Sequence, residues 1–226
     1  MLAALGRIVT ATARYPLALG TAPDRYRIDD TQVPFVFLQG VSDDTDQARA
    51  EFGEFIAVLA KAAAGEPTRV SPRFVSVLRP LVTGDDECTG AQAAVLCGDK
   101  PAPRDPERYW EDVRCSRAEQ PLFGPLVDNI GVCSFWGRPR ERPTQVRHGA
   151  PALIVAATGD PRTTYRSSVA LHGLLSGSPL LTVKGTNRHG LYGEYGNACV
   201  DAKVNRYLAT GTLPPADETC PSRAER

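Results

Sequence analysis

The spacing of apolar residues changes near residue 150 of this chain. Before that point the apolar positions recur at helical intervals, most clearly between Ala48 and Gly65. The apolar stripe there consists of Phe52, Phe55, Ile56, Leu59 and Ala60. Gly65 and the following Pro67 are typical of a helix end. The pattern predicts helical structure from residue 1 to about residue 84.

Three more stretches follow before the change. Residues 71–82 have the pattern of a short helix broken by Pro80, and residues 106–125 begin as a helix that ends at Pro121. Residues 91–97 are apolar but too few to assign by period. A stretch rich in proline and arginine, residues 137–151, then predicts a surface linker.

Beyond Pro151 the pattern alternates between strands and helices. The apolar run ALIVAAT predicts a buried parallel strand, and TTYRSSVALHGLL predicts a helix after it. A second strand, PLLTV, and a second helix, NACVDAKVNRYLATG, follow, and Gly211 ends the latter. This order predicts an α/β fold with a parallel sheet. We therefore expect a helical region over residues 1–145 and an α/β region over residues 146–226.

Composition and charge narrow the classes of protein that fit. Twenty-six basic and 26 acidic residues give a net charge of zero, and no basic stripe with interleaved aromatics predicts a nucleic-acid partner. No apolar run approaches the roughly 20 residues of a membrane span. The first 20 residues lack a basic start before their apolar part, which favours an amphipathic helix over a signal peptide. No cofactor is expected, and no oligomeric state is predicted.

The chain has six cysteines and no Cys-x-x-Cys pair, so the sequence predicts no metal site. An even number of cysteines favours disulfides and an exported protein, with buried free thiols as the alternative.

Asp160 and His189 are the candidate catalytic residues. Asp160 follows the first predicted strand, and His189 follows the second in a loop rich in glycine. Functional groups of parallel sheets gather at the carboxyl ends of strands, and this order matches the last two members of a Ser…Asp…His triad. Alternatively, Asp160 merely caps the helix expected near Thr163. His172 is expected on a helix face and His148 in the linker.

The chain resembles the tripeptidyl aminopeptidase-like α/β hydrolases, exported bacterial serine peptidases. The similar segments are PALIVAATGDPRTTY, RHGLYG, NACVDAKVNRYLATGTLP and the final TC, with AVLCGD and FGPLVDNIGVCSFW upstream. The resemblance implies a partial α/β-hydrolase fold, with a helical lid over residues 1–145 and a C-terminal hydrolase region over 146–226. It also implies that Asp160 is the acid of the triad and His189 its base. Ala157 and Thr164 depart from the glycine and proline common there, and the histidine loop is about one residue longer.

The resemblance implies a disulfide pairing as well. It pairs Cys199 with Cys220, which closes a loop of roughly 20 residues and is worth about 3 kcal/mol in the loop-entropy model. It pairs Cys97 with Cys133, which leaves Cys88 for Cys115.

The serine nucleophile of such an enzyme is missing. Its usual motif, Gly-x-Ser-x-Gly, does not occur in the 226 residues; GVSDD lacks the second glycine, and GVCSF has Cys133 at the centre. We therefore expect part of a serine exopeptidase, secreted or in the cell envelope, that is inactive unless completed by an N-terminal half. Peptides or esters are its expected substrates. The alternatives are a secreted, non-catalytic binding domain, an esterase-type hydrolase, and a cysteine hydrolase that uses Cys133 with His189.

Overall fold

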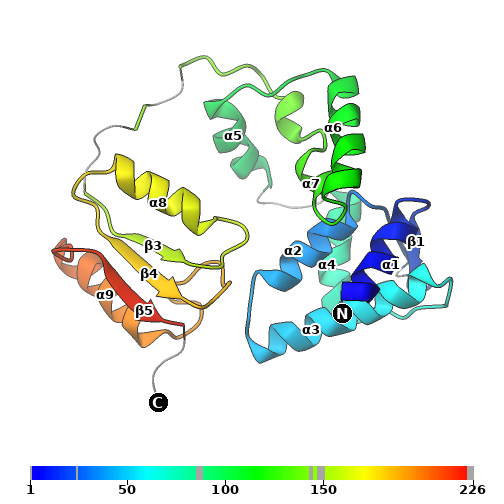
Figure 1. Cartoon of the computed structure of the whole chain (residues 1–226), viewed down its shortest axis with the longest axis horizontal. Helices are drawn as coiled ribbons and strands as arrows, with labels where there is room; N and C mark the ends of the chain where they lie inside the picture. The colour runs from blue at the N-terminus through cyan, green and yellow to red at the C-terminus, as the bar shows by residue number, and fades with distance from the viewer. Residues whose placement is uncertain (1, 24, 85–88, 143–144, 147–150, 223–226) are drawn as a thin grey trace. The chain divides into compact units, whose positions relative to one another are not determined.

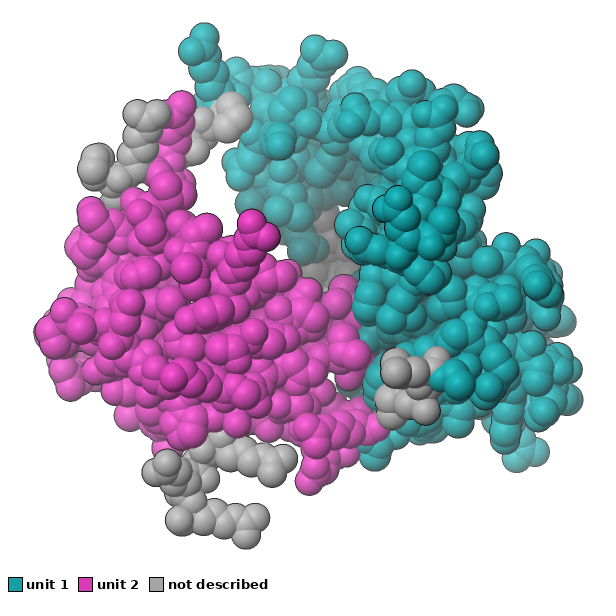
Figure 2. Space-filling view, in the orientation of Figure 1, with its two compact units in different colours: residues 1–37, 50–144 teal, residues 38–49, 145–226 magenta. Residues whose placement is uncertain are grey.

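The computed structural model describes residues 2–23, 25–84, 89–142, 145–146 and 151–222. The chain divides into two compact units (Figure 2), the first made of residues 1–37 and 50–144, the second of residues 38–49 and 145–226. Each unit is described by itself. No helix in the described part of the chain is both long enough and apolar enough to cross a membrane.

The first unit is mainly helical (Figure 1). Its helices are α1 (Leu2–Thr12), most of α2 (Val33–Val41) and α3 (Asp46–Ala63), α4 (Pro72–Thr83), α5 (Thr89–Asp99), α6 (Pro106–Glu119) and α7 (Gly124–Val127), with the 3₁₀ turn η1 (Val132–Ser134). An antiparallel hairpin of β1 (Leu17–Leu19) and β2 (Tyr26–Ile28) corrects the expectation of helices throughout. Each strand is only three residues long, with a buried, exposed, buried pattern, so no period could reveal it.

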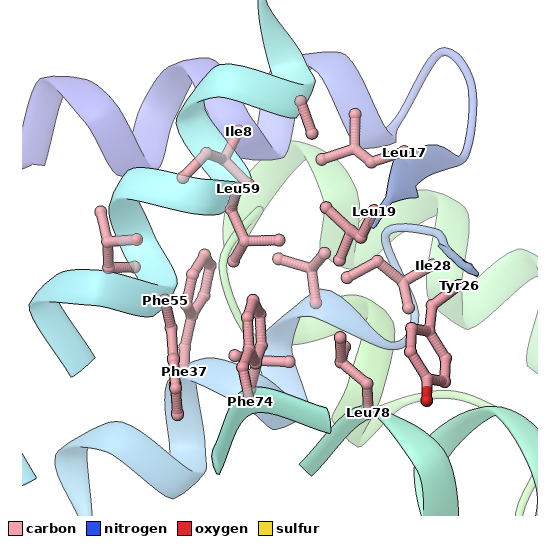
Figure 3. Close-up of a cluster of buried hydrophobic side chains, with 14 of the residues drawn as sticks. Ile8, Leu17, Leu19, Tyr26, Ile28, Phe37, Phe55, Leu59, Phe74 and Leu78 are labelled. Atoms are coloured by element: carbon pink, nitrogen blue, oxygen red, sulfur yellow. The ribbon is translucent and has the colours of Figure 1, made fainter. Parts of the chain in front are cut away.

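Apolar side chains from α1, the hairpin and α2 to α4 fill the core of this unit (Figure 3). Phe55 and Phe74 stack with their ring centroids 4.3 Å apart, and Leu59 and Leu78 are fully buried beside them. Burial of one such side chain contributes about 1.5–3 kcal/mol. The apolar stripe read from the sequence of α3 is therefore the face that this helix turns to the core.

Helix α4 corrects a second expectation, because it continues through Pro80. A proline inside a helix leaves the carbonyl four residues earlier without its usual donor. Here that residue is Ser76, which is exposed, so water can bind its carbonyl oxygen. The helix ends three residues later, where Gly84 adopts the left-handed conformation (φ 68°).

The second unit contains a parallel sheet of three strands in the order β3 (Ile154–Ala157), β4 (Leu180–Lys184) and β5 (Glu218–Pro221). Helix α8 (Tyr165–Leu174) connects β3 to β4, and α9 (Ala198–Thr210) connects β4 to β5 (Figure 1). The α/β fold class predicted from the sequence is thus confirmed. Strand β5 was not predicted, because four residues, ETCP, carry no period.

The described residues form two disulfides. Cys97 on α5 is bonded to Cys133 in η1, and Cys199 on α9 is bonded to Cys220 on β5. These are the first two pairings that the family resemblance implies. The third pairing involves Cys88, which lies outside the described residues, and Cys115 is an exposed free cysteine.

Candidate active site

The loops that follow β3 and β4 lie side by side at the carboxyl edge of the sheet. Ala157 pairs with Val183, so the two strands end together. Past the strands, the Gly159 N–H donates to the Thr186 carbonyl oxygen over 2.9 Å. A Cβ atom at Gly159 would stand 2.8 Å from that oxygen, so the close approach requires glycine. Parallel pairing and this glycine bring the Asp160 and His189 loops together.

The carboxylate of Asp160 and the ring of His189 are in direct contact. His189 Nδ1 lies 2.9 Å from Asp160 Oδ2. The same oxygen accepts the hydroxyl of Thr163 over 2.6 Å, and that hydroxyl lies 3.4 Å from Nδ1. The Asp160 side chain is only 7% exposed, whereas that of His189 is 40% exposed. The pair therefore joins a buried acid to an accessible imidazole.

The other carboxylate oxygen of Asp160 forms hydrogen bonds within the loop that carries this residue. Oδ1 accepts the backbone N–H groups of Arg162 (2.8 Å) and Thr163 (3.1 Å). Helix α8 begins only after Thr164, whose side chain makes no capping hydrogen bond. Asp160 therefore caps the turn before α8 rather than the helix itself, while its other oxygen faces the histidine.

These contacts set the protonation state of Asp160. Burial by itself would raise the pKa of the carboxyl group. The hydrogen bonds from the Thr163 hydroxyl, the His189 ring and the two backbone N–H groups outweigh that effect, so the pKa lies below its ordinary value. Asp160 is therefore a carboxylate at neutral pH.

The backbone of His189 is fixed on both sides. Its N–H donates to the Ser42 carbonyl oxygen over 3.1 Å, and its carbonyl oxygen accepts the Tyr195 hydroxyl over 3.2 Å. Burial, followed by the charges of Asp43 and Glu194, raises the pKa of Tyr195, so its hydroxyl keeps the proton that it donates. Among the described residues, nothing forms a hydrogen bond with His189 Nε2, which leaves this nitrogen available.

Among the residues that the structure describes, no serine nucleophile is hydrogen-bonded to this pair. No serine or cysteine in the described ranges forms a hydrogen bond with the His189 ring. The cysteine-hydrolase alternative is wrong for the oxidised protein, because the sulfur of Cys133 is bonded to Cys97. Nor does the described portion contain a cluster of three or more side chains suited to a metal ion.

Of the two remaining histidines, the structure describes His172, which has other partners. His172 is on α8, where Nδ1 lies 2.8 Å from the Ser178 carbonyl oxygen and Nε2 lies 3.2 Å from Asp217 Oδ2. His148 lies outside the described residues. The sequence reasoning missed Thr163 and Tyr195; an aspartate followed three residues later by a threonine is a turn pattern that could have indicated the first.

The sheet and its acid–imidazole edge define the class of protein: this is part of an α/β-hydrolase fold. Residues 120–220 match the family model described as TAP-like protein. This region of the chain is therefore similar to the TAP-like α/β hydrolases, and the resemblance inferred from the sequence is confirmed.

Several curated proteins are similar. Serine protease Hip1 of Mycobacterium tuberculosis is 33% identical over 140 residues, which cover 58% of this chain and 26% of that protein. Carboxylesterase B of the same organism is 35% identical over 137 residues, covering 56% and 25%. Tripeptidyl aminopeptidase of Streptomyces lividans is 35% identical over 95 residues, covering 41% and 18%. The chain thus matches about a quarter or less of the length of these relatives.

Proposed function

We propose that this chain supplies the acid and the base of a serine hydrolase of the TAP-like family. His189 is the general base, and Asp160 is the residue that orients it. The serine nucleophile comes from a part of the hydrolase that these 226 residues do not include. The 2.9 Å contact between His189 Nδ1 and Asp160 Oδ2 at the edge of a parallel sheet carries the proposal.

The geometry suits the work of such a pair. The Asp160 carboxylate accepts a hydrogen bond from Nδ1–H, so the proton stays on Nδ1 and the lone pair is on Nε2, the nitrogen that points away from the acid. Nε2 takes the proton of the serine hydroxyl as it attacks and then delivers it to the leaving group. The buried carboxylate stabilises the imidazolium formed in between. No cofactor or metal is needed for these steps.

The names of the relatives support two candidate substrate classes. Two of them are named as a serine protease and a tripeptidyl aminopeptidase, which supports an exopeptidase that cleaves short peptides from an amino terminus. The relative named Carboxylesterase B supports ester hydrolysis as the second candidate. Comparing kcat/KM for a tripeptide p-nitroanilide with that for a p-nitrophenyl ester decides between them.

The location and the helical region are also part of the proposal. Two disulfides support an exported protein, secreted or held in the cell envelope, because oxidising compartments retain such bonds. Residues 1–145 are proposed to act as the lid of the hydrolase, and residues 146–226 as its C-terminal region.

Labelling with a fluorophosphonate probe tests the function. The chain alone is expected to remain unlabelled. Co-expression with an upstream hydrolase segment carrying Gly-x-Ser-x-Gly, sought in the DNA before the codon for residue 1, is expected to restore labelling at that serine. We call this combination the completed hydrolase.

Two controls make the result decisive. His189→Gln is expected to abolish labelling of the completed hydrolase, whereas His172→Gln leaves it unchanged. Labelling of a serine in the isolated chain would contradict the proposal. An unlabelled combination that is folded and soluble would favour the alternative, a non-catalytic binding domain.

A further inference from the structure

The turn between α2 and α3 contacts both loops of the candidate site. It comprises Val41, Ser42, Asp43 and Asp44, here called the clamp segment, and it belongs to the second unit although the rest of both helices lies mainly in the first. Its contacts link residues about 144 positions apart in the chain. Nothing in the acid–base chemistry proposed above assigns it a role.

Three consecutive residues of the histidine loop bind the clamp segment. The Asn187 side chain donates to the Val41 carbonyl oxygen over 2.5 Å, and the His189 N–H donates to the Ser42 carbonyl oxygen over 3.1 Å. Between them, Arg188 Nε lies 2.5 Å from Asp44 Oδ1. This series of contacts fixes the backbone that carries the imidazole.

The Asp44–Arg188 ion pair is well shielded from water. The Arg188 side chain is 13% exposed and that of Asp44 15% exposed. The Arg188 guanidinium also lies over the ring of Tyr195, 4.7 Å from its centroid, and the Tyr195 hydroxyl donates to the His189 carbonyl oxygen. Removing one partner of such a shielded pair leaves an uncompensated charge, so its loss disturbs the structure more than the loss of an exposed pair. Arg188 therefore connects the clamp segment to both sides of His189.

Ser42 extends the clamp to the acid loop. Its hydroxyl accepts Arg162 Nε over 2.9 Å while donating to the Leu38 carbonyl oxygen in α2. Arg162 also binds the Gln39 side chain, and its own backbone N–H donates to Asp160. The buried Ser42 is thus bonded to the histidine loop through its carbonyl and to the acid loop through its hydroxyl.

The clamp segment is itself rigid. Asp43 Oδ1 accepts the Thr45 N–H over 2.8 Å, and Thr45 Oγ1 accepts the Ala48 N–H at the start of α3 over 3.2 Å. These two bonds hold the end of the clamp segment that leads into α3, and the Ser42 hydroxyl and N–H hold the other end by donating to the carbonyl oxygens of Leu38 and Gln39. A rigid element bonded to two loops sets the distance between them.

We infer that the clamp segment, through the Asp44–Arg188 pair, is a positioning element that keeps the His189 ring against Asp160. The inference rests on the proposed function for its catalytic meaning, because it deepens the account of the same site. None of the described hydrogen bonds of Asp44 and Arg188 reaches the imidazole, so both are inferred to act through the His189 backbone.

Nuclear magnetic resonance of the isolated chain tests the inference without any activity. The downfield Nδ1–H signal of His189 is expected in the wild type, and His172→Gln identifies which signals belong to the other described histidine. Asp44→Asn is expected to broaden or abolish the His189 signal, and Asp44→Glu to restore part of it. Amide exchange at the His189 N–H is expected to accelerate about tenfold or more, because its bond to Ser42 opens.

A matched ion pair in the same unit supplies the control. Lys203 Nζ lies 2.6 Å from Glu218 Oε2, away from both loops, and Glu218→Gln is expected to leave the His189 signal and its amide exchange unchanged. Arg188→Lys keeps the charge but not the stacked planar group, and its fold is expected to persist. Unchanged signal and exchange in a folded Arg188→Lys or Asp44→Asn variant would overturn the inference.

The completed hydrolase separates this inference from the proposed function. There, Asp44→Asn is expected to lower kcat by about tenfold with little change in KM, as a displaced base requires. An active enzyme with unaltered kcat in the variant overturns the positioning role alone. If Asp44→Asn loses the His189 Nδ1–H signal but the completed wild type has no activity, the proposed function is overturned and the positioning role of the clamp segment is still supported.

Discussion

The described residues of the second unit include two histidine–aspartate pairs, and their surroundings differ. In the first, His189 Nδ1 contacts the buried Asp160, and its Nε2 has no hydrogen-bond partner among the described residues. In the second, both nitrogens of His172 are occupied, one by the Ser178 carbonyl oxygen and one by Asp217, whose side chain is 56% exposed. The contact distances, 2.9 and 3.2 Å, hardly distinguish the pairs.

Under the proposed function, the difference illustrates what a general base requires beyond a carboxylate. A ring held at one nitrogen is oriented and still has a site for a proton from a substrate or nucleophile. A ring held at both nitrogens connects two segments, here α8 and the chain before β5. Asp217 supports that structural role, since its other oxygen accepts the N–H of Leu180 at the start of β4 over 2.9 Å.

The largest expected effect separates the two histidines. In the completed hydrolase, His189→Gln is expected to lower kcat by about 10⁵–10⁶-fold, because the base is lost. His172→Gln is expected to leave kcat near the wild-type value. Hydrolysis of a tripeptide p-nitroanilide measures both, and a comparable loss in the two variants would erase the distinction.

The acids are expected to differ in the same way. Asp160→Asn is expected to lower kcat by about 10⁴-fold, because an amide in place of the carboxylate favours the wrong tautomer of the ring. Asp217→Asn should leave kcat unchanged and lower the free energy of unfolding by about 1 kcal/mol. Steady-state kinetics and urea unfolding give the two quantities. A wild-type kcat in Asp160→Asn would refute the proposal that Asp160 orients His189.

Thr163 has no counterpart in the second pair, and its removal sharpens the comparison. Thr163→Val keeps the shape but removes the hydroxyl bound to Asp160, and one lost hydrogen bond of about 1.4 kcal/mol lowers kcat roughly tenfold. Thr163→Ser should restore most of the rate. Thr182→Val, which removes a hydroxyl bonded to Tyr165 elsewhere in the unit, is the control and should not change kcat.

The smallest expected effect concerns stability at low pH. The pKa of Asp160 is lower in the folded chain than its ordinary value, so the folded state favours the ionised form. Its contribution to stability is complete above the ordinary aspartate pKa of about 4 and disappears as the pH falls through the lowered value. Urea unfolding between pH 6 and about pH 2 should therefore show a shallower acid loss in Asp160→Asn than in the wild type. Parallel curves would contradict this.

The candidate pair could be predicted from the sequence because the position of each residue depends only on the segment just before it. Each residue follows an apolar run that forms a strand, and parallel strands bring their carboxyl ends to one edge whatever lies between them. The same reasoning identified the core face of α3 and the end of α9 at Gly211. Such features depend on periods and on single residues with a special backbone preference.

The contacts that support the pair could not be predicted in this way. The segment GVSDDTD has the composition of an ordinary polar turn, and nothing in it indicates that Asp44 meets Arg188 far along the chain. Strand β5 and the β1–β2 hairpin are too short to have a period. Pro80 was expected to break the helix, because a proline leaves the carbonyl four residues earlier without its donor. That carbonyl belongs to the exposed Ser76, where water can replace the donor, so the helix continues.

The path of the backbone through the two units has a practical consequence. Residues 38–49 fold with the α/β unit, yet the chain on either side of them belongs to the helical unit. Cleavage by a protease near residue 145 would therefore leave two fragments that still share one unit, held by Asp44, Ser42 and their partners. A recombinant fragment that starts near residue 145 would lack residues 38–49 of its own unit. The α/β unit is therefore not encoded by one continuous stretch of the gene.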